Sequence, residues 1–236
     1  MIPHTATPGL VCAATPDELQ TFGSIEAGYA EPMGPGLWRI PEGYAVLTGV
    51  GIPVTLLRLV PWVETLKPDW LLNLGIAGAY TGSGLDIGDV IIGTSEIFAD
   101  VGMEAGNANV DGEADFLPVS ETLFGDPWHR KPLPLWVPEW VAETETPKVR
   151  LGRGATVNTC TGREATGQMR RKLFGVDFES MEGAAVALAG TAKSLPVFES
   201  RVISNAASDR DVRPENIKLA LRSLRTYWEA HRGKLS

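Results

Sequence analysis

The chain has 236 residues, of which 44% are hydrophobic and 21% are charged, and its formal net charge is −8 at pH 7. This composition is typical of one globular domain and excludes a disordered chain. The acidic balance argues against a nucleic-acid partner, because phosphate backbones are held by many Lys and Arg side chains. No apolar stretch approaches the ~20 residues of a membrane span and no signal peptide is evident, so we expect a cytoplasmic protein without a membrane partner.

The residues that most often bind metals are few and scattered. Cys12 and Cys160 lie far apart without metal-ligand spacing, and we expect both to be reduced and structural. The histidines His4, His129 and His231 have no neighbouring ligand pattern. The sequence therefore predicts no metal site and no cofactor.

Three short apolar runs in the first third of the chain predict buried strands, at residues 9–14, 43–48 and 70–74. Thr15 follows the first run and lies three positions before Glu18, which is the capping-box pattern of a helix N-terminus. A second helix is predicted at about 53–66 because its apolar residues have helical spacing.

The third run is followed by Gly75, Ile76, Ala77, Gly78 and Ala79. We interpret these small residues as a loop in which backbone amides approach a ligand.

Later in the chain, the region 103–147 is rich in Pro and Trp and predicts a long, irregular but ordered loop insertion. Around it, the pattern predicts strands at 88–94, 96–100, 148–155, 176–178 and 197–204, and helices at 163–173, 182–193 and from Pro214 onward.

The alternation of strands and helices predicts one α/β domain over 1–236, with a largely parallel, curled central sheet. In such folds ligands bind at the carboxyl ends of the strands. The segments 15–18, 75–79, 180–182 and 204–205 all follow predicted strands, so we expect one pocket to collect them.

Each candidate side chain also has a structural explanation. Glu182 opens a small apolar helix, where the helix dipole favours a carboxylate whatever its function. The capping box accounts for Glu18 completely, and Asn205 is typical of a turn. The same turn offers Asp209 and Asp211 as acids.

Several segments together carry a family resemblance: 10–18, 48–51, 73–78, 87–90, 180–185 and 201–205. The chain resembles the purine nucleoside phosphorylase and nucleosidase superfamily, most closely its nucleosidase branch. The resemblance implies a twisted, partly closed mixed sheet flanked by helices. It also implies a small purine nucleoside as the partner, no cofactor, and a homodimer or higher homo-oligomer.

The resemblance implies roles for individual residues. Glu182 corresponds to the carboxylate that binds both ribose hydroxyls, Met181 packs against the sugar, and Glu18 corresponds to the water-activating glutamate. The remaining substrate-binding positions that it implies are Gly75, Ile76, Ala77, Gly78, Val157 and Asn205.

Asn205 departs from adenine-directed nucleosidases, which have an aspartate at this position. An amide donates to N7 or O6 and suits a 6-oxopurine, so hypoxanthine is favoured over adenine and Asn205 joins Glu18 and Glu182 as a catalytic candidate. The combination resembles futalosine hydrolases, which implies hydrolysis to hypoxanthine and dehypoxanthine futalosine in menaquinone biosynthesis. Asp209 assisting the leaving group, a phosphorylase acting on 6-oxopurine nucleosides and a non-catalytic nucleoside-binding protein stay open as alternatives.

Overall fold

The computed structural model describes residues 8–22, 25, 28–108, 114–118, 131–142, 144–145, 148–208 and 212–235. In chain order the elements are β1 (Gly9–Ala13), α1 (Pro16–Leu19), β2 (Glu31–Gly34), β3 (Leu37–Ile40), β4 (Gly43–Leu47), α3 (Ile52–Leu66), β5 (Trp70–Ala79), β6 (Val90–Phe98), β7 (Gly102–Ala108), β8 (Ala114–Pro118), β9 (Leu133–Pro134), β10 (Thr144–Glu145), β11 (Lys148–Thr156), α5 (Glu164–Phe174), β12 (Phe178–Ser180), α6 (Gly183–Ala192), β13 (Val197–Ala206), α7 (Pro214–His231) and the 3₁₀ helix η2 (Arg232–Lys234).

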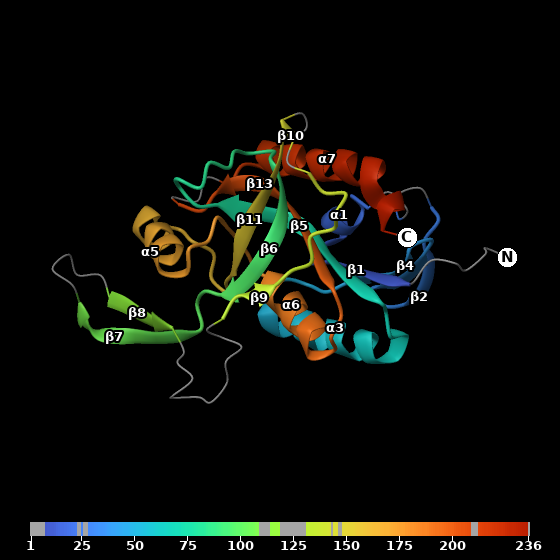
Figure 1. Ribbon diagram of the computed structural model, residues 1–236, viewed down its shortest axis with the longest axis horizontal. Coiled ribbons are helices and arrows are strands. Elements are labelled where there is room, and N and C mark those ends of the chain that lie inside the picture. The colour runs from blue at the N-terminus through green and yellow to red at the C-terminus, as the bar shows by residue number, and fades with distance from the viewer. Residues whose placement is uncertain are drawn as a thin grey trace.

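One mixed sheet dominates the molecule (Figure 1). Its strands follow the order β10-β11-β6-β13-β5-β1-β4-β3-β2, and the short strand β12 pairs with both β11 and β5. The pairs of β5 with β13, β13 with β6, β6 with β11, β11 with β12 and β12 with β5 therefore complete a closed ring. The predicted α/β class and the partly closed mixed sheet are confirmed.

Alternate residues of the central strands enter two different cores. On β1, Val11 and Ala13 belong to one apolar cluster, whereas Leu10 and Cys12 belong to another. Successive side chains of a strand point to opposite faces, so a continuous apolar run indicates a strand that is covered on both sides.

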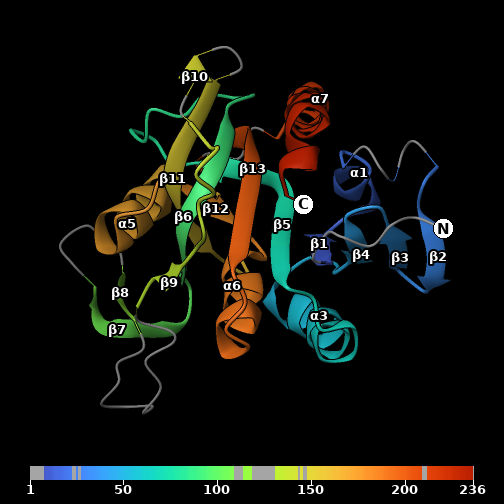
Figure 2. The same cartoon turned by 45° about the vertical axis from the view of Figure 1, so that its right-hand side comes forward.

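Helices provide that cover (Figures 1 and 2). Helix α7 packs on β13, β5 and β6 at one face and buries Leu224 and Trp228 there. Helices α3 and α6 lie together at the other face. Because α6 consists mainly of Ala and Gly, its backbone approaches the strands closely.

Two predicted boundaries are wrong. Residues 75–79 are not a loop, because β5 continues to Ala79 with β13 parallel on one side and β12 antiparallel on the other. The two strands expected at 88–94 and 96–100 are the single strand β6, which has an irregular register opposite Gly152 and Arg153.

The region 103–147 is less irregular than expected in the parts that the structure describes. It contains most of β7 and all of β8, which pair as an antiparallel hairpin that extends from the main body (Figure 1). Among the described residues, no helix is long and apolar enough to cross a membrane.

Candidate active site

A cleft of about 240 Å³ lies where the carboxyl ends of the central strands converge. Its lining comes from the ends of β1, β5, β12 and β13 and from the segments that follow them. The lining residues are Ala14, Thr15, Glu18, Val50, Ile76, Ala77, Gly78, Cys160, Thr161, Glu179, Ser180, Met181, Glu182, Ser204, Asn205 and Val212. The expected pocket at the strand ends is thus present.

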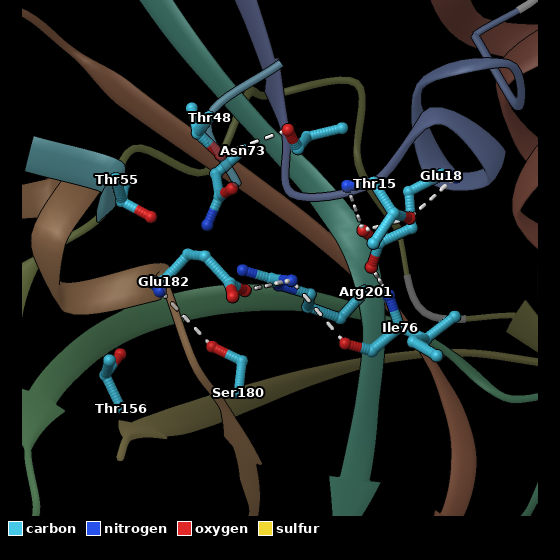
Figure 3. Close-up of polar contacts among 12 residues, drawn as sticks. Thr15, Glu18, Thr48, Thr55, Asn73, Ile76, Thr156, Ser180, Glu182 and Arg201 are labelled. Carbon is cyan, nitrogen blue, oxygen red and sulfur yellow. Dashed lines mark hydrogen bonds and ion pairs between the residues drawn. The ribbon is translucent and has the colours of Figure 1, made fainter. Parts of the chain in front are cut away.

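Glu18 has both its structural role and a position in the cleft. The Thr15 backbone N–H and hydroxyl donate to Glu18 Oε2 at 3.0 and 2.8 Å, and the Glu18 N–H donates back to the hydroxyl at 3.3 Å, so the capping box is formed. Ile76 N–H, on β5, donates to Glu18 Oε1 at 3.0 Å (Figure 3). These bonds hold the Glu18 carboxylate against the backbone of β5. They do so although α1 has only 4 residues.

Glu182 is the N-cap of α6 and is 4% exposed. The Gly51 N–H donates to its Oε1 at 3.1 Å, and Arg201 Nη1 lies 3.5 Å from its Oε2. Burial raises the pKa of Glu182 above its ordinary value near 4.5, Arg201 opposes that shift, and Glu18 adds to it. Glu18 and Glu182 are therefore close enough to influence each other across the cleft.

Arg201 is a functional candidate that the sequence analysis did not single out. It lies on β13, is 1% exposed, and places its guanidinium between Glu182 and the backbone of Ile76 (Figure 3). Burial lowers the pKa of Arg201, but the carboxylates of Glu199, Glu182 and Glu18 raise it by more. The net pKa is raised, so the guanidinium is charged. Glu199 lies only two positions away, but Glu182 and Ile76, the contacts that place Arg201 at the cleft, lie 19 and 125 positions away in the chain.

Gly75, on β5, lies close to the Glu18 carboxylate and the Arg201 guanidinium. A Cβ at this position would overlap Glu18 Oε1 and would lie 2.6 Å from Arg201 Nη1. A side chain at position 75 would therefore collide with these two groups, which explains the glycine. It is not explained by the loop that we expected. It is not among the cleft-lining residues, whereas Ile76, Ala77 and Gly78 are.

Asn205 lines the cleft near the end of β13. The Ser204 hydroxyl donates to Asn205 Oδ1 at 2.9 Å, and Asn205 Nδ2 donates to the carbonyl of Ala206 at 2.9 Å. Nδ2 carries a second N–H, which can donate to an acceptor on a ligand. It lies against Gly78, where a Cβ would be 3.1 Å away.

A third carboxylate, Glu179, lines the cleft, and the sequence analysis did not single it out either. Its oxygens accept from the Thr161 N–H at 2.7 Å, the Thr161 hydroxyl at 2.6 Å and the Tyr80 hydroxyl at 2.8 Å, and Arg170 Nη1 lies 3.4 Å away. Four donors satisfy this buried charge and hold the segment containing Cys160 against the cleft. Cys160 is thus a lining residue, a position that the sequence did not predict, and Cys12 is buried in the core.

The structure does not bring every expected residue to the site. The side chain of Val157 is fully buried in an apolar cluster with Tyr80 and Ile97 and does not line the cleft. Asp209 and Asp211 lie outside the described residues. In the described part of the chain, no group of three or more His, Cys, Asp or Glu side chains is arranged to hold a metal ion.

A family model described as the Phosphorylase superfamily matches residues 11–227. The chain belongs to this superfamily. It is 32% identical to a futalosine hydrolase from Streptomyces coelicolor over 80% of this chain and 78% of that one. It is 30% identical to a futalosine hydrolase from Thermus thermophilus over 82% of this chain and 84% of that one.

Among solved structures, a futalosine hydrolase mutant of Helicobacter pylori has a TM-score of 0.74 at 16% identity, over 98% of this chain and 100% of that chain. This likeness concerns the fold. The superfamily and the nucleosidase branch expected from the sequence are confirmed.

Proposed function

We propose that this protein is a futalosine hydrolase, which cleaves the N-ribosidic bond of futalosine with water. The single observation that carries this proposal is that Glu18 and Glu182 line one cleft with Asn205, while the charged Arg201 contacts Glu182. The two futalosine hydrolases that match most of the chain support the same substrate. The products are then hypoxanthine and dehypoxanthine futalosine, and the role in menaquinone biosynthesis stays a prediction.

The proposed reaction separates charge on the sugar. As the bond from C1′ to the purine breaks, its electrons move to the base and positive charge develops on the ribose ring. The Glu182 carboxylate, beside the ribose hydroxyls, stabilises this charge more in the transition state than in the substrate. Glu18 accepts a proton from the water that attacks C1′, so that hydroxide is added to the sugar. Asn205 Nδ2 donates a hydrogen bond to the departing 6-oxopurine anion, which takes up a proton from solvent, and Glu18 returns its proton to solvent.

Water is favoured over phosphate because the residues that the structure describes give the cleft no cationic lining. None of the described lining residues is Lys or Arg, and Arg201, which lies beneath the cleft, is engaged by Glu182 and Glu199. Arg58 is exposed on α3, close to Gly49, and is not a lining residue. A phosphate dianion would need positively charged donors that converge on it.

We expect the purified protein to release hypoxanthine from futalosine in phosphate-free buffer, at a rate that added phosphate does not increase. Chromatography of the products, with futalosine, aminodeoxyfutalosine, inosine and methylthioadenosine compared as substrates, measures this. An absolute requirement for phosphate would refute the hydrolase and establish a phosphorylase. Binding without cleavage of any of the four would instead favour the nucleoside-binding protein.

Asn205→Asp should reverse part of the preference for 6-oxopurines. A carboxylate facing the N7 and O6 acceptors leaves polar groups unpaired, at about 1–3 kcal/mol for each group. We therefore expect the ratio of kcat/KM for futalosine to that for aminodeoxyfutalosine to fall about 5- to 150-fold. Asn216→Asp, on α7 and away from the cleft, is the matched control. An unchanged ratio in Asn205→Asp would remove the role assigned to this amide.

The homodimer or higher oligomer is proposed from the family resemblance. The outer face of α3 supports it, because Val54, Leu57 and Val60 are exposed there and Leu57 is 75% exposed. This face continues to Val50 at the edge of the cleft. A solution molar mass equal to that of one chain, measured by light scattering, would contradict the proposal.

A further inference from the structure

Two acidic side chains lie fully buried behind the active site, and the proposed reaction does not use them. Glu96 on β6 and Glu199 on β13 are each 0% exposed, on antiparallel neighbouring strands, and neither lines the cleft. A buried ionised carboxylate is costly unless donors satisfy it, so two of them together require an explanation.

Each carboxyl group has one satisfied oxygen. Glu199 Oε1 accepts from Arg201 Nε at 3.0 Å and from Asn73 Nδ2 at 2.9 Å. Glu96 Oε2 accepts from the Thr156 hydroxyl at 2.7 Å. Among the described residues, no donor N–H or O–H reaches the second oxygen of either group, Glu96 Oε1 or Glu199 Oε2.

Three glycines from different elements leave room for these carboxyl groups. A Cβ at Gly183 would overlap Glu96 Oε1 and would lie 2.8 Å from Glu199 Oε1. A Cβ at Gly93 would lie 2.8 Å from Glu199 Oε2, and one at Gly154 would overlap Glu96 Oε1. The two carboxyl groups thus occupy one small space, in which a single proton between them would satisfy both remaining oxygens.

We propose that Glu96 is protonated and donates a hydrogen bond to Glu199 Oε2, and that this acid–carboxylate pair positions Arg201 and Glu182. Burial, followed by the charge of Glu199, raises the pKa of Glu96 well above its ordinary value, while the Thr156 hydroxyl and Arg201 oppose the shift. A hydrogen bond with Glu199 also raises the pKa of Glu96. With one proton present, the Glu96–Glu199 pair carries a single negative charge, which contacts Arg201.

Two series of contacts connect the Glu96–Glu199 pair to the active site. Glu199 holds Arg201 Nε, and Arg201 Nη1 contacts Glu182. On the other side, the Thr156 hydroxyl that donates to Glu96 accepts from the Ala184 N–H at 2.6 Å, in the first turn of the helix that Glu182 caps. Both carboxyl groups are therefore positioning residues that act through the groups they hold.

The surroundings of Glu96 contain few other titratable groups. β13 contributes Glu199 and Arg201, and β11 contributes the Thr156 hydroxyl. Helix α6 contributes backbone amides only, because none of the side chains of Gly183–Ala192 titrates, and Glu182 precedes it. A pH effect that disappears when Glu96 is replaced can therefore be assigned to this pair.

The first test compares the kcat of two matched variants, Glu96→Gln and Glu199→Gln, for which we expect losses of different size. Glu96→Gln keeps a donor toward Glu199 and an acceptor for Thr156, so we expect kcat within about twofold of the wild type. Glu199→Gln removes the charge that holds Arg201, and we expect kcat to fall at least about tenfold with a smaller change in KM. Equal losses, or the reverse order, would overturn the positioning role. This test rests on the proposed function.

The second test needs no activity and applies even if Glu199→Gln fails to fold. The raised pKa means that folded Glu96 keeps a proton that the unfolded chain loses above about pH 4.5, so the stabilisation present at low pH is lost as the pH rises. Between pH 5 and pH 7, Glu96→Gln should therefore gain in its folding equilibrium constant relative to the wild type, by up to about 100-fold, which is the limit for one proton over two pH units. Urea unfolding at both pH values measures this difference. A pH-independent difference would overturn the shared proton, whatever the substrate proves to be.

Discussion

Glu182→Gln is expected to lower kcat/KM for futalosine about 10²- to 10³-fold while the protein stays folded. The substitution keeps the size and hydrogen-bonding oxygen of the side chain but removes the negative charge that faces the developing positive charge of the sugar. Loss of one such electrostatic contact typically costs this much, because the contact is preorganised and shielded from water. Steady-state kinetics and thermal unfolding of the same preparation measure both halves of the prediction.

The raised pKa of Glu182 gives this prediction a pH signature. Because burial favours the protonated form, the carboxylate that the reaction needs is lost at a pH above the ordinary carboxyl value near 4.5. The acid limb of the kcat/KM profile of the wild type should therefore be displaced upward. A raised pKa also means that ionising Glu182 at neutral pH lowers the free energy of unfolding. Glu182→Gln should therefore be at least as stable as the wild type at neutral pH.

Glu215→Gln is the matched control, because it removes a carboxylate from the start of another helix, α7, at an exposed position. It should leave kcat/KM and its pH profile unchanged. A loss of less than about tenfold in Glu182→Gln would show that the sugar does not depend on this carboxylate. Unfolding of Glu182→Gln at neutral pH would contradict the assigned sign of its stability effect.

Local patterns predicted the elements whose signals are local. The capping box at Thr15 and Glu18, the helix α3 and the apolar stripe of α7 follow from residues within a few positions of one another. The strand ends that form the cleft were found in the same way, because the carboxyl edge of the strands follows from the α/β class.

The errors occur where distant pairing overrides local preference. Glycines at 75 and 78 favour a loop in isolation, yet residues 75–79 pair with β13 and β12 on both sides and stay in the strand. In β6, the register skips from Gly93 to Ser95 opposite β11, so one irregular strand has the sequence pattern of two.

The buried polar groups are invisible to local patterns for a related reason. Glu96, Glu199 and Arg201 lie within otherwise apolar strands, and the Asn73 side chain that contacts Glu199 is 126 positions away in the chain. Glu199 and Arg201 lie two positions apart on β13, but only the paired strands show that Asn73 and Glu96 lie beside them. The sequence thus predicted the side chains that line the cleft at strand ends better than those that hold them.

Glu18→Gln should abolish most turnover, lowering kcat about 10²- to 10⁴-fold, because an amide cannot accept the proton of the attacking water. The substitution is unusually specific here, since Gln also satisfies the last position of a capping box. Glu18 now accepts from Thr15 through Oε2 and from the Ile76 N–H through Oε1, so the single carbonyl oxygen of Gln can replace only one of these two acceptors. The protein should therefore stay folded, with a loss of about 1–3 kcal/mol for the acceptor that is missing, and bind futalosine with nearly unchanged affinity.

Calorimetric titration of Glu18→Gln with futalosine, together with single-turnover kinetics, separates binding from chemistry. Asp17→Asn is the matched control, because Asp17 is an exposed acid in the same turn of α1 and does not line the cleft. A large loss of stability in Glu18→Gln would mean that the capping box, and not the proton transfer, explains the glutamate. Retention of more than about a tenth of the wild-type kcat would require a different base for the water, because a positioned base contributes at least about 10²-fold.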